Sequence, residues 1–381
     1  MQSSATRCRI KVPPPAGSNA TPSHLMTATV NRAHLTVDLD ALAHNLGVLR
    51  AAAPGAEVAA VVKADAYGLG VGPVGRRLAS DGVRSFFVAR LAEGEALRAA
   101  LGDQDLAIHV FDGLTEGSAE QLAAAALIPV LNTPAQVAAA LAAGATRVAL
   151  QVDTGMNRLG LTCDAARAVA AAGRLDVALL VSHLGSATDP AEPRNAEQLR
   201  AFREIRALFP GARASLAASA GAFLGPDFRY DQVRAGISLF GGGPEERPDR
   251  RLRAVATLTA PILDIRELQA GDRVGYGEMF TAARPMRIAV VGAGYADGFL
   301  RAAAGKAQVW CAGALRTVLT VNMDLMTIDL GPASVSVGGS VQLLGPKAPL
   351  DDLAAAAGTV AHEVLVRLGQ RAERAYVASL G

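Results

Sequence analysis

Three consecutive segments decide the fold: RVALQVD (residues 147–153), DAARAVAAA (164–172) and VALLVSH (177–183). They read in order as an apolar run, an Ala-rich stretch of helical period and a second apolar run, which predicts one β-α-β unit. The same alternation runs from Leu35 to about residue 240. The candidate strands are Glu57–Lys63, Ser85–Ala89, Ala107–Phe111, Ile128–Leu131, Arg147–Asp153, Val177–His183, Ala214–Ala218 and Gln232–Leu239. The helical stretches include Asp40–Ala52, Pro134–Ala143, Asp164–Ala172 and Ala196–Leu208.

Eight β-α repeats within about 200 residues predict a (β/α)8 TIM barrel, with a doubly wound open sheet as the alternative. The positions of four polar residues favour the barrel. Lys63, His183, Ser219 and Arg234 fall at or near candidate strand ends, where barrel enzymes assemble their sites.

The pattern changes at GGGPEERPDR (residues 241–250), a cluster typical of a linker. Strands without intervening helices follow it. They are Val255–Arg266, Met286–Val291, Gln308–Cys311, Arg316–Val321, Met326–Asp329 and Ser340–Leu344, before short helices at Leu350–Ala356 and Val360–Leu368. We therefore predict an α/β protein in three parts: a disordered extension (1–33), a barrel domain (34–248) and a mainly-β domain (249–381).

The composition excludes several classes of protein. The apolar residues, 51% of the chain, are dispersed and form no run long enough to cross a membrane. The net charge of +2 and the scattered arginines argue against a nucleic-acid partner. The three cysteines lack metal-site spacing, so we expect no metal site. An odd number of cysteines fits a reducing compartment, and the first residues lack the apolar core of an export signal, which together predict a cytoplasmic protein.

Lys63 is the candidate for covalent chemistry. The chain has only four lysines among its 37 basic residues, and Lys63 ends the apolar strand AEVAAVVK. An amine at a barrel rim with an apolar stem is desolvated, which lowers its pKa and makes it available as a Schiff-base nucleophile. The alternative is a lysine that simply extends from a strand end into water.

VVKADAYGLG (residues 61–70) resembles the cofactor-lysine motif of the alanine racemase family. Further segments resemble that family in matching order, from about Leu35 to Tyr376. They are VDTGMNRLG (152–160), SHLGSATDP (182–190), ASAG (218–221), VRAGISLFG (233–241), VGYGEMF (274–280), GYADGFLR (294–301), MDLMTID (323–329) and RAERAY (371–376).

The resemblance implies a fold-type III enzyme that uses pyridoxal 5'-phosphate and forms a homodimer with shared active sites. Lys63 would carry the cofactor as an imine, and Arg234 would face the pyridine nitrogen. Because guanidinium only donates hydrogen bonds, the ring nitrogen would stay unprotonated and the ring would be a weak electron sink. That favours prompt reprotonation of the substrate over transamination or decarboxylation.

Racemisation needs one base on each face of the substrate α-carbon. The resemblance implies Lys63 on one face and, from the second subunit, Tyr295 on the other. An unperturbed tyrosine with a pKa of ~10 is a poor base at neutral pH. A chain from Tyr295 through His183 to Arg234 would bring positive charge close and lower the phenol pKa.

The same resemblance implies the groups that hold cofactor and substrate. The cofactor phosphate would bind Tyr67, Ser219, Tyr376 and the backbone amides of Gly236 and Ile237. The substrate carboxylate would bind Arg158 and, from the other subunit, the amide of Met323.

Gln151 departs from the family pattern. Many members have at this position a lysine that becomes carbamylated and orients the arginine. A glutamine amide can accept a hydrogen bond from Arg158 but brings no charge, so we expect no carbamate here.

The predicted function is interconversion of L- and D-alanine, which supplies D-alanine for peptidoglycan. One alternative is a fold-type III amino-acid decarboxylase, which would need an acidic residue where Arg234 stands. The other is a pyridoxal-phosphate carrier or homeostasis protein, which would lack the second domain and Tyr295.

Overall fold

The computed structural model describes residues 32–378 except 103–104, 146 and 369–370. The predicted disorder of residues 1–33 therefore lies almost wholly outside the described residues.

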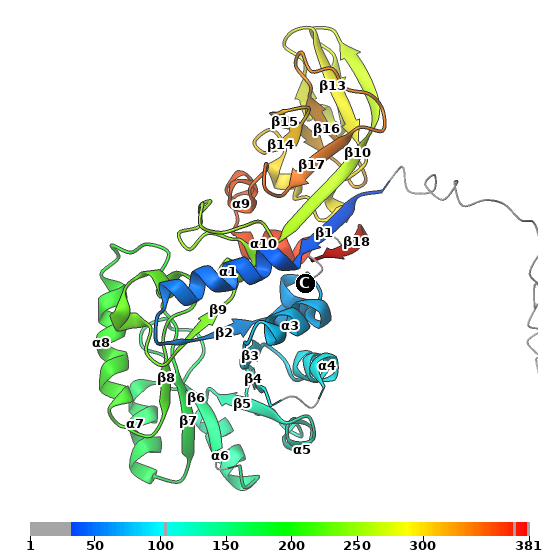
Figure 1. Ribbon diagram of the computed structural model, residues 1–381. Helices are drawn as coiled ribbons and strands as arrows, with labels where there is room; N and C mark the ends of the chain where they lie inside the picture. Colours follow the sequence, from blue (N-terminus) through cyan, green and yellow to red (C-terminus); the bar gives the residue numbers. More distant parts are fainter. Residues whose placement is uncertain (1–31, 103–104, 146, 369–370, 379–381) are drawn as a thin grey trace, which may run out of the picture. The chain divides into compact units, whose positions relative to one another are not determined.

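The first sheet is a ring of eight parallel strands (Figure 1) in the order β8-β7-β6-β5-β4-β3-β2-β9. An isolated parallel bridge between Ala218 and Arg234 joins its two ends. The strands are β2 (Glu57–Val61), β3 (Ser85–Val88), β4 (Ala107–Val110), β5 (Leu127–Leu131), β6 (Arg147–Gln151), β7 (Asp176–Val181), β8 (Arg213–Ser215) and β9 (Gln232–Ala235). The predicted barrel is confirmed, and the open doubly wound sheet is wrong.

Helices cover the outside of this ring (Figure 1). They are α1 (Leu39–Ala52), α3 (Val71–Ser80), α4 (Leu91–Leu101), α5 (Ala119–Ala124), α6 (Pro134–Ala142), α7 (Cys163–Ala172) and α8 (Arg194–Arg206). Local sequence explains where several begin. Thr133 and Thr162 accept backbone N–H groups of the first turns of α6 and α7, which satisfies donors that a helix start leaves unpaired.

The second sheet has the order β13-β16-β15-β14-β17-β10-β1-β18. Its strands are β1 (His34–Asp38), β10 (Ala256–Leu268), β13 (Met286–Val291), β14 (Gln308–Cys311), β15 (Ala314–Val321), β16 (Met326–Asp329), β17 (Ser340–Leu344) and β18 (Glu373–Val377). Two short strands, β11 (Arg273–Val274) and β12 (Phe280–Thr281), pair separately. The helices of this part are α9 (Leu350–Ala357) and α10 (Ala361–Arg367). This sheet confirms the mainly-β part of the predicted fold.

The two ends of the described chain meet in this second sheet. β1 pairs antiparallel with β10 and parallel with β18. The first residues of the predicted barrel domain are therefore hydrogen-bonded to strands of the β-rich part, and the predicted division at residue 248 stays a prediction.

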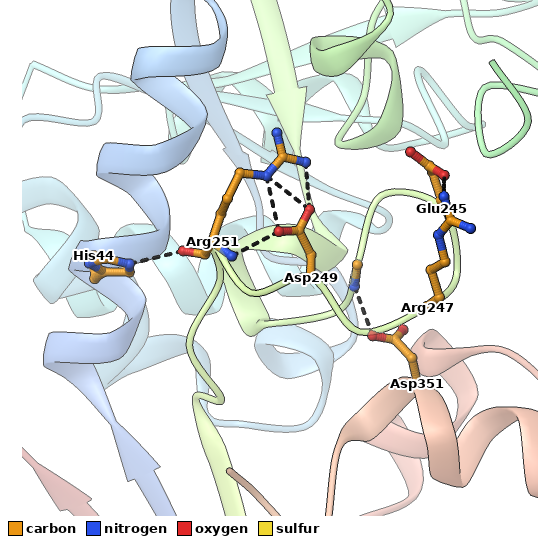
Figure 2. Close-up of polar contacts among 7 residues, drawn as sticks. His44, Glu245, Arg247, Asp249, Arg251 and Asp351 are labelled. Carbon is orange, nitrogen blue, oxygen red and sulfur yellow. Dashed lines mark hydrogen bonds and ion pairs between the residues drawn. The ribbon is translucent and has the colours of Figure 1, made fainter.

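The linker between the two sheets is fixed by polar contacts (Figure 2). Asp249 accepts the backbone N–H and the guanidinium of Arg251, and the Arg251 carbonyl lies 3.0 Å from His44 Nε2 on α1. On the other side, Asp351 of α9 accepts the Gly243 N–H at 3.0 Å. The linker predicted at residues 241–250 is thus hydrogen-bonded to α9 directly and connected to α1 through Arg251.

Asp351 also lines a cavity of about 480 Å³ beside this linker. Only 3% of the residue is exposed, and the hydrogen bond it has among the described residues comes from a neutral amide. Burial raises the pKa of the Asp351 carboxyl, against the Gly243 hydrogen bond, and the negative charges of Asp352 and Glu246 add to the increase. The ionised form of Asp351 therefore lowers the free energy of unfolding.

Asp351→Asn is expected to raise the melting temperature at pH 8 by a few degrees, corresponding to about 1 kcal/mol. Since the folded pKa lies above the unfolded one, the contribution of Asp351 to the stability of the wild type is greatest below the unfolded pKa of about 3.9 and is lost as pH rises through the folded value. The gain should therefore shrink as pH falls from 8 to 5, which thermal denaturation would measure. Asp352→Asn, at an exposed neighbour on α9, removes only one of the charges that raise the Asp351 pKa and should give a smaller gain. An equal gain at both pH values would contradict this account.

Candidate active site

Lys63 begins a left-handed turn immediately after β2. Residues 64–67 all have positive φ, between 53° and 56°, although none is glycine. Such backbone costs roughly 1–2 kcal/mol per residue and persists only where its surroundings impose it. Here Glu93 accepts the Ala64 and Ala89 N–H groups at 2.9 and 2.8 Å, and Asp65 accepts the Val71 N–H at 2.7 Å. These carboxylates hold the turn that carries Lys63.

The Lys63 amine lies near the positive charge of Arg158 and the negative charge of Glu93. Protein atoms shield its ammonium although the residue as a whole is exposed. Burial, and secondly the charge of Arg158, lower the pKa of Lys63 below its ordinary value. The neutral, nucleophilic amine is therefore more accessible than in an exposed lysine.

Arg234 lies at the end of β9 and is 2% exposed. Its Nη1 donates to the Ser215 carbonyl and hydroxyl, both at 2.7 Å, and its Nη2 donates to the Ser182 carbonyl. Its Nε makes no hydrogen bond with any residue that the structure describes. Burial lowers the pKa of Arg234 to about 9, so the guanidinium remains charged at neutral pH.

His183 is joined to this arginine. Its Nδ1 lies 3.3 Å from Arg234 Nη2. Because guanidinium only donates, Nδ1 must accept, and the ring proton stands on Nε2. Burial, followed by the charges of Arg234 and Arg158, lowers the pKa of His183 to about 3. The imidazole is therefore neutral at physiological pH, with one N–H available to donate.

Ser219 is hydrogen-bonded to backbone groups near the predicted phosphate site. Its Oγ accepts the N–H groups of Gly236 and Ser238 at 2.9 and 3.2 Å, whereas no such bond is described for Ile237. A Cβ at Gly236 would lie 2.4 Å from the Tyr67 hydroxyl, so the absence of a side chain lets that hydroxyl approach the backbone. Hydroxyls and amides converge here as a phosphate requires.

Tyr376 reaches the turn after Lys63 from β18. Its hydroxyl donates to the Leu69 carbonyl at 3.0 Å and would lie 2.1 Å from a Cβ at Gly70. Arg374 donates to the Gly68 carbonyl at 2.8 Å. The last strand is therefore hydrogen-bonded to the turn that begins with Lys63.

Arg158 is carried by a turn built on Asp153. The Asp153 carboxylate accepts the N–H groups of Gly155 and Arg158, each at 2.8 Å. Although burial acts to raise it, these bonds lower the pKa of Asp153. Gln151 donates to the Leu159 carbonyl at 2.6 Å. The glutamine is thus bonded to the backbone of this loop, and no bond to the Arg158 side chain is described.

Tyr295 and Met323 lie on adjoining turns of the β-rich part. The Tyr295 N–H donates to the Asn322 carbonyl and the Ala296 N–H to the Met323 carbonyl, both at 3.0 Å. Their side chains are open to solvent, with Tyr295 43% and Met323 54% exposed. No contact of Tyr295 with Lys63 or His183 is described within the chain.

Several residues at this site were missed by sequence reasoning. Glu93 supports the Lys63 turn, Arg194 donates to the Gly155 carbonyl of the Arg158 loop at 2.7 Å, and the His362 ring lies 5.8 Å from the Tyr67 ring. Of these, only Glu93 had a local signal, because a glutamate at the third position of a helix often accepts backbone N–H groups at the helix start.

Within the described residues, there is no group of three or more His, Cys, Asp or Glu side chains that could hold a metal ion. Across the same residues, no helix combines the length and apolar character needed to span a membrane.

Comparison with known proteins identifies the family. Residues 37–244 match the family model "Alanine racemase, N-terminal domain", and residues 255–376 match "Alanine racemase, C-terminal domain". An alanine racemase of Methylobacterium sp. (strain 4-46) is 44% identical over 365 residues, which cover 92% of this chain and 100% of the relative.

Two solved structures agree with this result. The biosynthetic alanine racemase of Pseudomonas aeruginosa is 34% identical with a TM-score of 0.86, over 91% of this chain and 100% of that one. The alanine racemase of Bartonella henselae with covalently bound pyridoxal phosphate is 33% identical with a TM-score of 0.85, over 91% and 99% of the two chains. The chain belongs to the alanine racemase family.

Proposed function

We propose that this protein interconverts L- and D-alanine with pyridoxal 5'-phosphate as its cofactor. The observation that carries the proposal is the buried Arg234, whose Nε has no hydrogen-bond partner among the described residues and which is linked to a neutral His183 close to Lys63. A guanidinium N–H matches an unprotonated pyridine nitrogen, since one donates and the other accepts.

The remaining residues fit the other parts of this cofactor. Lys63 offers an amine whose pKa is lowered. Tyr67, Ser219 and the Gly236 amide bring hydroxyl and N–H groups together for the phosphate, and Ile237 and Tyr376 complete the proposed set. Bound pyridoxal phosphate would withdraw electrons from the substrate α-carbon and make its proton removable.

The reaction requires proton transfer on two faces of one carbon. We assign removal of the α-proton of D-alanine to Lys63 on one face, and removal of that of L-alanine to Tyr295 on the other. The neutral His183 can donate its Nε2–H to the phenolate oxygen of Tyr295, and the charge of Arg234 behind it stabilises that anion. Arg158 and the Met323 amide bind the substrate carboxylate and keep the α-carbon between the two bases.

The same residues support the proposal of a homodimer with shared active sites. Tyr295 and Met323 are exposed on one pair of turns, and no contact with Lys63 is described for them. We therefore place them in the partner's site. The proposed role of the protein, acting in the cytoplasm, is to supply D-alanine for peptidoglycan synthesis.

Incubation of the pyridoxal-phosphate-loaded protein with L-alanine tests the proposal. We expect optical activity to decay to zero as equal amounts of the two enantiomers form. Release of carbon dioxide instead would favour the decarboxylase, and neither reaction by fully loaded protein would favour the carrier. The buried arginine opposes the decarboxylase, and the presence of the second sheet opposes the carrier.

A further inference from the structure

Arg371 joins the two turns that carry Tyr295 and Met323. Its Nε and Nη2 donate to the two oxygens of Asp297, at 2.9 and 2.7 Å. Its Nη1 donates to Asp324, the residue after Met323. The Asp297 side chain is 5% exposed and also accepts the Gly294 N–H at 2.9 Å. We call these three residues, Arg371, Asp297 and Asp324, the arginine clasp.

The backbone around the clasp leaves little room for movement. A Cβ at Gly294 would lie 2.2 Å from the Asn322 carbonyl oxygen. A Cβ at Gly298, where φ is 95°, would lie 2.1 Å from the Arg367 carbonyl oxygen. The backbone of the Tyr295 turn therefore packs closely against the Met323 turn on one side and the end of α10 on the other.

We propose that Arg371 is a positioning residue for racemisation, which sets where the Tyr295 phenol and the Met323 amide stand relative to each other. This inference rests on the proposed function. Arg371 itself touches neither reacting group within the described contacts, and it acts by tying their two turns to one side chain.

The chemistry of the clasp suits that task. A bidentate arginine–carboxylate pair fixes orientation as well as distance, and here the carboxylate is almost fully buried. Without the guanidinium, Asp297 would become a buried charge with its main partner removed, and its turn would have to move toward water. Displacement of a positioned group by about 1 Å can reduce a rate by about 100-fold.

The test uses Arg371→Ala and Arg371→Lys in the full-length protein, with Arg367→Ala as the matched control. Arg367 pairs with Glu363 on the exposed face of α10, and its side chain has no described contact with either turn. Hydrogen exchange of the cofactor-free protein is measured over residues 294–298 and 322–325. The kcat and KM of racemisation, and the rate at which each enantiomer exchanges its α-proton with solvent, are measured on the loaded protein.

For Arg371→Ala we expect amide exchange at both turns to accelerate at least about tenfold and kcat to fall about 10- to 100-fold. Exchange of the D-alanine proton through Lys63 should fall less than exchange of the L-alanine proton, because it depends on the Met323 amide but not on Tyr295. Arg371→Lys should recover part of the loss, and Arg367→Ala should resemble the wild type.

Two results would overturn the inference: a wild-type kcat in Arg371→Ala, or an equal loss of proton exchange on both faces. Failure of the wild type to racemise alanine would instead refute the proposed function, and the exchange of the cofactor-free turns would still report whether the clasp holds them.

Discussion

Lys63→Ala abolishes racemisation, with an expected fall in kcat of at least about 10⁴-fold, because the variant lacks both the cofactor's covalent attachment and one base. The amine stands on a turn to which Glu93 and Asp65 are hydrogen-bonded, whereas the other lysines among the described residues, Lys306 and Lys347, belong to the β-rich part. The absorbance band of lysine-bound pyridoxal phosphate should disappear together with the activity.

Lys63→Arg tests whether the reaction needs the amine of Lys63 or only its positive charge. It keeps a cation beside Arg158 but offers no nucleophilic amine, so it should be as inactive as the alanine variant. Thermal denaturation should show both variants folded, since Lys63 is exposed and donates no hydrogen bond in the described structure. Retention of the absorbance band in either variant would exclude Lys63 as the attachment point.

Tyr295→Phe has the second large effect. It should retain the lysine-bound cofactor while kcat falls about 10²- to 10⁴-fold, the range for loss of one general acid–base group. Because the equilibrium constant of racemisation is one, kcat/KM must fall equally in both directions. The two enantiomers should differ instead in proton exchange: D-alanine should still exchange its α-proton with solvent, and L-alanine should not. The primary isotope effect should grow for L-alanine. Equal exchange of both enantiomers would contradict the two-base scheme.

Mixing the two inactive variants tests whether the site is shared. If Tyr295 serves the partner subunit, a mixed dimer of Lys63→Ala and Tyr295→Phe chains has one intact site. Random reassociation should then restore about a quarter of wild-type activity. If Tyr295 served its own chain, mixing would restore nothing.

The barrel could be predicted because its signals are local. Buried parallel strands appear as continuous apolar runs, and β2 to β7 lie within a few residues of their predicted bounds. β9 was predicted to extend to Leu239 but ends at Ala235, since Ile237–Phe240 forms a short 3-10 turn. Gly236 is not extended there, and an apolar pattern alone cannot show where a strand turns.

The parts that escaped prediction depend on distant contacts. Ala-Asp-Ala-Tyr after Lys63 favours an ordinary helix by propensity, whereas the left-handed turn is bonded to Glu93, a carboxylate from elsewhere in the chain. β18 is short and mostly exposed, so it has neither an apolar run nor alternation. The link between Arg234 and His183 was expected from family resemblance, whereas Glu93 and the arginine clasp join segments that no spacing rule connects.

The pairing of β18 with β1 has a consequence for biosynthesis. Residues 34–38 leave the ribosome before the barrel strands, but their parallel partner, Glu373–Val377, follows only after the barrel and the other strands of the second sheet. The same late strand brings Tyr376 and Arg374 onto the turn after Lys63. The barrel strands can therefore begin to fold during translation, but β18 can bond to the turn after Lys63 only once it has followed them from the ribosome. A ribosome-bound chain stalled before residue 373 should accordingly hold pyridoxal phosphate poorly, whatever the state of its barrel.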